Sequence, residues 1–95
     1  MSAVALVRLP SALRPYAGGA KELEIEGSTL REVLDGLGAR FPALERRLRD
    51  ETGTLRRYVN FYVGDDECRT SRGLDTAVPP GGEVMIIPAV AGGTA

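Results

Sequence analysis

One block of helix-forming sequence stands between two groups of strand-forming segments, and this order restricts the fold more than any other feature. Thr29 and Glu32 fit a capping box, in which the hydroxyl and the carboxylate each accept a free backbone N–H. The apolar residues that follow recur at the spacing of one helix face: Leu30, Val33, Leu34 and Leu37. Pro42 opens a shorter helical segment with an apolar edge of Leu44 and Leu48. We therefore predict one main helix and a short second helix on the same core.

Strand-like segments lie on both sides of this helical block. Before it, residues 3–9 and 21–26 have strand patterns and form a hairpin-type pair in our prediction. After it come residues 57–63, the brief segment 67–69 and the apolar run 84–87. The order predicts an α+β protein with the β-grasp (ubiquitin-like) fold. We expect a mixed sheet of four to five strands, with one main helix and a short second helix packed on one face.

Near the end of the chain, a predicted buried strand is followed by a tail in which the side chains become smaller toward the glycine pair. Residues 84–87 are apolar and largely β-branched, whereas Gly92 and Gly93 have no side chain. A glycine pair fits a channel too narrow for any side chain, although a frayed terminus is the common alternative. With 95 residues there is room for one domain. We predict a β-grasp domain over residues 1–91 and a flexible tail over residues 92–95, in which a Thr-Ala extension follows the glycine pair.

Charge balance and cysteine count exclude several classes of protein. Twelve basic and thirteen acidic residues give a net charge of −1, so no overall field attracts the chain to nucleic acid or to an anionic membrane. The single cysteine excludes an internal disulfide, and no apolar run approaches the roughly 20 residues that span a bilayer. The chain has no histidine, the usual proton shuttle near neutral pH. We expect a cytoplasmic protein with no nucleic-acid or membrane partner.

Three further features have both a chemical and a structural interpretation. Cys68 could carry sulfur, but the preceding run Asp65-Asp66-Glu67 would raise the pKa of its thiol, which favours a structural role. The acidic run lacks the spaced oxygen ligands of a calcium loop, so we expect a solvated turn and no metal site. A group of arginines could contact phosphates, but no aromatic stacking platform accompanies it. We expect a solvated helix face, with partner docking as the alternative, for Arg46, Arg47, Arg49, Arg56 and Arg57.

Five short stretches, spread over nearly the whole chain, together carry a family resemblance. They are Val-Arg-Leu-Pro at 7–10, Leu-Arg-Pro-Tyr-Ala-Gly-Gly at 13–19, Arg-Tyr-Val-Asn-Phe-Tyr-Val at 57–63, Gly-Leu-Asp-Thr at 73–76 and Ile-Pro-Ala-Val-Ala-Gly-Gly at 87–93. In these stretches the chain resembles the small ubiquitin-like sulfur carriers, which include the molybdopterin synthase small subunit and the thiamine sulfur carrier. Within that family it is most similar to the carriers of actinobacterial cysteine biosynthesis.

The resemblance implies a carrier that works with partner enzymes and is not itself an enzyme. An E1-like adenylating enzyme would use ATP to activate the carboxylate of Gly93, and a sulfur nucleophile would convert it to a thiocarboxylate. A sulfur-accepting synthase would then take the sulfur. The carrier would bind no cofactor; Gly92 and Ala91 would enter the partner's channel. One face of the sheet would dock through apolar side chains, for which the candidates are Phe61, Pro88 and Val90, although these residues also suit the core.

The chain departs from the family after its glycine pair. Carriers ready for activation end at the second glycine, whereas Thr94 and Ala95 follow Gly93 here. Because the Gly93 carbonyl is then held in a peptide bond, we expect a protease to cut between Gly93 and Thr94. The alternative is activation at Ala95 itself. Two other classes remain open: a ubiquitin-like modifier conjugated through its glycine, and a plain interaction subunit with an inert tail.

Overall fold

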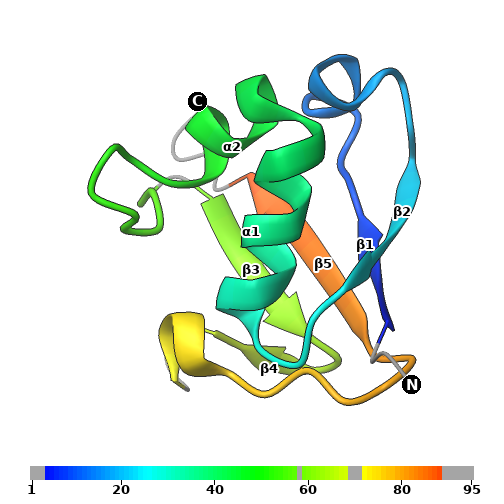
Figure 1. The fold of residues 1–95 in the computed structure, drawn as a ribbon, viewed down its shortest axis with the longest axis vertical. Helices are drawn as coiled ribbons and strands as arrows, with labels where there is room; N and C mark the ends of the chain where they lie inside the picture. Colours follow the sequence, from blue (N-terminus) through cyan, green and yellow to red (C-terminus); the bar gives the residue numbers. More distant parts are fainter. Residues whose placement is uncertain (1–3, 58, 69–71, 89–95) are drawn as a thin grey trace.

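A five-stranded mixed sheet forms the centre of the protein (Figure 1). The computed structural model describes residues 4–57, 59–68 and 72–88. The strands lie in the order β2-β1-β5-β3-β4, and their bounds are β1 (Val4–Arg8), β2 (Glu22–Glu26), β3 (Val59–Val63), β4 (Asp66–Glu67) and β5 (Glu83–Pro88). β1 and β5 are parallel, and every other neighbouring pair is antiparallel. This is the predicted β-grasp arrangement, with the predicted hairpin pair β1–β2.

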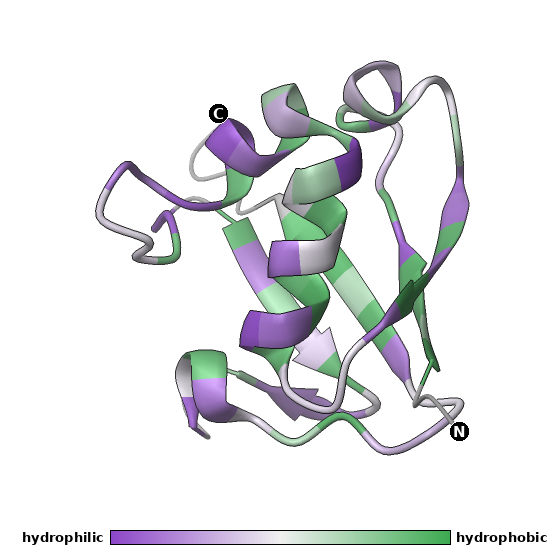
Figure 2. Ribbon diagram, viewed as in Figure 1, coloured by the Kyte–Doolittle hydropathy of each residue, from purple (hydrophilic) through white to green (hydrophobic). Residues whose placement is uncertain are grey.

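Two helices cover one face of this sheet (Figure 1). α1 (Leu30–Arg40) crosses the strands and α2 (Pro42–Leu48) follows it after a single residue. Figure 2 shows the apolar side of α1 turned toward the sheet and its polar side turned away. The predicted apolar stripe is fully buried against strand residues, and the largest core side chains are Phe61, Leu30, Leu34, Leu37, Leu44, Leu48 and Ile86. Within the described ranges, no helix is long and apolar enough to cross a membrane.

The start of α1 is capped, with one bond different from the prediction. The Thr29 hydroxyl accepts the backbone N–H of Glu32 at 3.2 Å, as a capping box requires. The Glu32 carboxylate, however, accepts the N–H of Ser28 at 2.8 Å and the Ser28 hydroxyl at 3.0 Å. Thr29 has an extended backbone and forms a β-bridge with Ala77. The N–H that reaches the Glu32 carboxylate is therefore that of Ser28, one residue before the N-cap. The two bonds from Ser28 lower the pKa of Glu32.

Some element bounds differ from the sequence prediction. The strand predicted over residues 57–63 begins at Val59, and the returning strand predicted over 67–69 is the two-residue β4, which begins one residue earlier. The described residues also form the 3₁₀ turns η1 (Arg14–Ala17) and η2 (Gly73–Asp75). The predicted boundary between domain and tail falls within residues 89–95, outside the described part of the chain.

Three glycines allow α1 to approach its neighbours closely. A Cβ on Gly27 would lie 2.8 Å from the backbone nitrogen of Val33. A Cβ on Gly36 would lie 2.9 Å from a methyl group of Ile25 in β2, and one on Gly38 would lie 2.7 Å from a carboxylate oxygen of Glu45 in α2. Because real Cβ atoms do not come this close to neighbouring atoms, α1 packs at a distance that only glycine permits.

Candidate docking face and carrier end of the sheet

β5 occupies the centre of the sheet and leads to the end of the chain. It is hydrogen-bonded to β1 on one side and to β3 on the other, and its last residue, Pro88, lies opposite Val59. The predicted site residues of the tail, Ala91, Gly92, Gly93 and Thr94, lie outside the described residues. Gly93 comes five positions after Pro88, so it can reach at most about 17 Å beyond the end of β5.

The face of the sheet without helices carries exposed apolar side chains next to this end. Side chains alternate along β5: Val84 and Ile86 are buried under the helices, whereas Met85 and Ile87 are 37% and 39% exposed. The register places Met85 between Arg8 and Tyr62 on the neighbouring strands and Ile87 beside Asn60. Large exposed apolar side chains on the central strand indicate a contact surface for another protein.

The predicted docking residues occupy different places. Phe61 is fully buried in the core, so its ring is not available to a partner, and the docking role expected of it is wrong for this conformation. Phe61 points to the helix-covered face because it shares that face with Val59 and Val63. Only the backbone of Pro88 is described, and Val90 lies outside the described residues. Met85 and Ile87 were not among the predicted docking residues. The available signal was that side chains of a strand point alternately to its two faces, so that an all-apolar central strand must present two of residues 84–87 on the face without helices.

A hollow of about 360 Å³ opens beside Met85 and Ile87. Its other walls come from the end of β1, the segment after it and the start of β2, and include Arg8, Arg14 and Lys21. Arg8 forms ion pairs with Glu22, at 3.4 Å, and with Glu83. The exposed apolar face of β5 is therefore bordered by a rim of charged side chains, in which Glu22 lies beside Arg8, Arg14 and Lys21.

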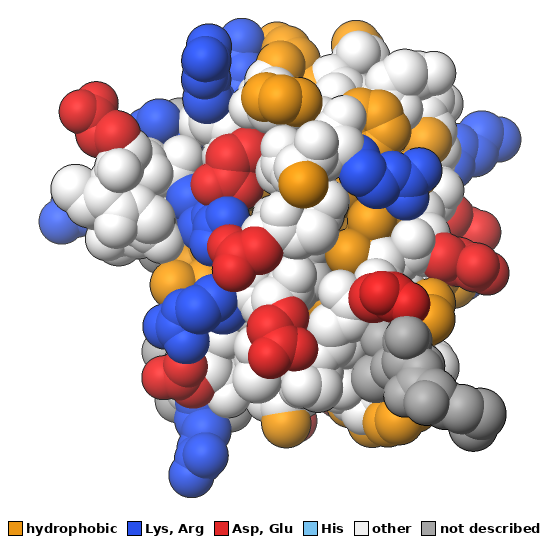
Figure 3. All heavy atoms as spheres, in the orientation of Figure 1, with side chains coloured by type: hydrophobic (Ala, Val, Ile, Leu, Met, Phe, Trp, Pro, Cys, Tyr) orange, Lys and Arg blue, Asp and Glu red, His pale blue; other side chains and the backbone are white. Residues whose placement is uncertain are grey.

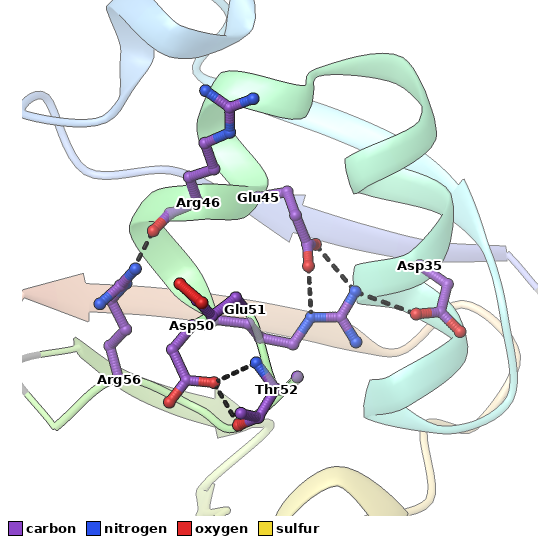
Figure 4. A pocket seen from close by; sticks show the side chains of 9 residues that line it. Asp35, Glu45, Arg46, Asp50, Glu51, Thr52 and Arg56 are labelled. Atoms are coloured by element: carbon purple, nitrogen blue, oxygen red, sulfur yellow. Dashed lines mark hydrogen bonds and ion pairs between the residues drawn. The ribbon is translucent and has the colours of Figure 1, made fainter.

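Arg49 does not belong to a solvated helix face, which corrects the sequence prediction. Its side chain is only 9% exposed and joins the two helices (Figure 4). The guanidinium donates to both carboxylate oxygens of Glu45 at 2.9 and 2.8 Å and lies 2.9 Å from the carboxylate of Asp35. Burial acts to lower the pKa of Arg49, but the bonds to Glu45 and Asp35 outweigh it and raise the pKa. Arg46 and Arg47, in contrast, are exposed as predicted.

Cys68 is a buried thiol directly after β4. Burial is the largest cause that raises its pKa, a hydrogen bond with Thr76 acts against it, and the charges of Glu67 and Asp66 raise it further. The predicted direction of the shift is confirmed, although burial outweighs the acidic neighbours on which the prediction was based. Asp65 and Asp66 are exposed at the hairpin tip. In the described ranges no three acidic, histidine or cysteine side chains gather as a metal site would require.

A family model fits nearly all of this chain. The model of the ThiS family matches residues 7–93, so the match includes the central strand and the glycine pair and ends on Gly93. The chain belongs to the ThiS family.

Individual ThiS-like relatives agree with this assignment. The sulfur carrier protein CysO of Mycobacterium tuberculosis is 45% identical over 89 residues, which cover 92% of this chain and 96% of CysO. The crystal structure of the Amycolatopsis orientalis BexX/CysO complex contains a chain that matches with a TM-score of 0.86 and 39% identity, over 93% of this chain and 98% of that one. The small archaeal modifier protein 1 of Methanosarcina acetivorans matches with a TM-score of 0.82 and 30% identity, over 97% and 98%.

Proposed function

We propose that this ThiS-family chain is a sulfur carrier loaded at the carboxylate of Gly93. The observation that carries the proposal is the family match up to Gly93, at the end of a chain whose central strand is fixed on both sides. The 45% identity to a protein named as a sulfur carrier supports the same role. A strand held by two neighbours gives the tail a rigid base, and a tail of small residues can enter a narrow channel.

The chemistry is divided between the carrier and its partners. An E1-like enzyme binds ATP and attaches AMP to the Gly93 carboxylate, with release of pyrophosphate. A sulfur nucleophile then displaces AMP and leaves a thiocarboxylate, from which a synthase takes the sulfur. The carrier itself supplies the tail and a docking surface and acts as no enzyme. Ala91 and Gly92 pass through the channel, and Met85 and Ile87 contact the partner beside its entrance.

Thr94 and Ala95 must be removed before activation. While they are attached, the Gly93 carbonyl is part of a peptide bond and offers no carboxylate for adenylation. A protease that cuts between Gly93 and Thr94 produces the active form. The alternative route needs no cleavage, because Ala95 itself is activated. In the first route only the protein that ends at Gly93 gains sulfur, whereas in the second the protein that ends at Ala95 gains it.

Intact-mass measurement tests this function. A protein ending at Gly93 is incubated with the E1-like enzyme of its own source organism, ATP and sulfide, and a sample without ATP is the control. We expect a mass gain equal to the replacement of one oxygen atom by sulfur, only when ATP is present. No gain with an enzyme that is shown to release pyrophosphate from ATP and this carrier would contradict the sulfur-carrier role.

A ubiquitin-like modifier is the second candidate function. The observation that favours it is the likeness to small archaeal modifier protein 1, at a TM-score of 0.82. Both functions share activation at the terminal glycine and differ in the acceptor. If the activated protein forms isopeptide adducts with lysines in an extract of the source cells, and the thiocarboxylate does not accumulate, the modifier is the correct function.

A further inference from the structure

A second hollow, on the helix side of the molecule, is lined by arginines. It measures about 370 Å³ and is enclosed by Tyr16 of η1, by Ala43, Arg46 and Arg47 of α2, and by Arg56 from the segment before β3. Figure 3 shows Lys and Arg side chains projecting at the end of the molecule that carries α2. Two segments, α2 and the stretch before β3, thus place three guanidinium groups around one depression, and Tyr16 of η1 completes its wall.

Contacts position two of these guanidinium groups, those of Arg47 and Arg56. Arg47 lies over the ring of Tyr16, 4.5 Å from its centroid. Arg56 donates its Nε–H to the backbone oxygen of Arg46 at 2.7 Å (Figure 4). Neither Arg46 nor Arg47 has an ion-pair partner within the described part of the chain. Arg47 combines a positioned guanidinium with the lack of an ion-pair partner among the described residues, so it loses little side-chain freedom when it binds an anion.

The hollow lies at the end of the sheet where the tail begins. The N–H of Val59 donates to the Arg56 oxygen at 3.3 Å, and Val59 lies opposite Pro88, the last residue of β5. The other end of β3 carries the exposed acidic tip Asp65-Asp66. The molecule therefore presents the arginine hollow beside the start of the tail and carboxylates at the far end of the same strand.

We propose that this arginine hollow binds an acidic segment of the protein that receives the tail, a proposal that rests on the function proposed above. Two or three carboxylates on a peptide match guanidinium groups spaced around a small depression, because each planar guanidinium can donate two hydrogen bonds to one carboxylate. A nucleic-acid backbone fits less well, since the chain has a net charge of −1 and Asp50 and Glu51 line the neighbouring hollow with Arg46 and Arg56. The contact makes docking depend on salt.

A peptide titration tests the hollow without any enzyme. The ¹⁵N-labelled full-length protein is titrated with the peptide acetyl-Gly-Glu-Asp-Glu-Gly-amide. The control is acetyl-Gly-Gln-Asn-Gln-Gly-amide, in which amides replace the three carboxylates. We expect amide shifts centred on Tyr16, Ala43, Arg46, Arg47 and Arg56. Arg46→Glu weakens binding about tenfold, whereas Arg72→Glu, the same charge change beside η2 at the opposite end (Figure 1), does not. Shifts centred on Lys21, tighter binding of a single-stranded RNA, or self-association without peptide would each overturn the proposal.

Activation kinetics place the hollow in the carrier's own reaction. With proteins ending at Gly93 and the E1-like enzyme, Arg46→Glu raises the KM for the carrier about tenfold at low salt and leaves kcat unchanged, because the tail is intact. Arg72→Glu is the matched control and leaves both constants unchanged. Equal effects of the two variants would overturn the proposed hollow while the wild type is still activated. If the wild-type protein itself is not activated, the sulfur-carrier function is contradicted instead. The peptide titration then tests on its own whether the hollow binds an acidic segment.

Discussion

Two arginines three positions apart have different roles in this protein. Arg46 is exposed, whereas Arg49 is buried between α1 and α2 with two carboxylate partners. The sequence places both beside the same short helix, and the difference arises from Asp35, which the chain reversal after α1 brings to Arg49 alone. A side chain's burial depended here on a neighbouring element that local sequence does not reveal.

Replacing Arg49 tests this ion-pair network. Arg49→Met leaves Glu45 and Asp35 without their shared cation, so we expect the free energy of unfolding to fall by about 2 kcal/mol. Urea denaturation measures the change. Arg46→Met is the matched control, because it removes an exposed arginine from α2 and changes stability by less than about 0.5 kcal/mol. Equal losses in the two variants would show that the network adds nothing to stability.

The buried thiol of Cys68 makes stability depend on alkaline pH. Because burial raises its pKa in the folded protein, the unfolded chain releases this proton first. The contribution is therefore complete below the unfolded pKa of about 8.5 and is lost as pH rises through the folded value. We expect wild type to lose more stability than Cys68→Ala between about pH 8 and pH 10 in urea titrations. Parallel pH profiles of the two proteins would contradict the raised pKa of Cys68. Loss of sulfur loading in a folded Cys68→Ala variant would contradict a purely structural role.

At the scale of elements, the sequence patterns predicted where the helices and strands lie, but not which of them pack closely against each other. The capping residue Thr29 and the apolar stripe placed α1, and the alternation in residues 21–26 placed β2. Close approach was not predictable, because a glycine in a helix reads as a weak position until the neighbour that it touches is known. Gly36 touches β2 and Gly38 touches α2, so both are packing positions.

The exposed residues of β5 provide a test at this scale. Ile87→Asp on the Gly93-ended protein should raise the KM for the E1-like enzyme about tenfold, because it places a charge in an apolar contact. Val4→Asp is the matched control: Val4 is 36% exposed, close to the 39% of Ile87, but begins β1 at the opposite end of the sheet. Circular dichroism confirms that both variants fold. Equal KM values for both variants would exclude the helix-free face near Ile87 from docking.

At the scale of the whole molecule, the order of elements was enough to predict the fold. One helical block between a pair of strands and three further strands allows few sheet arrangements, and the observed order places the last strand in the centre. The faces of that sheet were harder to assign. Phe61 was chosen for docking because it is large and apolar, yet the alternation of β3 directs it into the core while β5 exposes Met85 and Ile87.

The central claim is that a rigid sheet presents a thin tail whose Gly93 carboxylate is loaded with sulfur. The most direct measurement is tandem mass spectrometry of the C-terminal peptide after incubation with the E1-like enzyme, ATP and sulfide. The account predicts sulfur on Gly93 in the protein that ends there, and none on the protein that still carries Thr94 and Ala95. Sulfur on Ala95 of the longer protein, or on an internal residue such as Cys68 in either one, would contradict it.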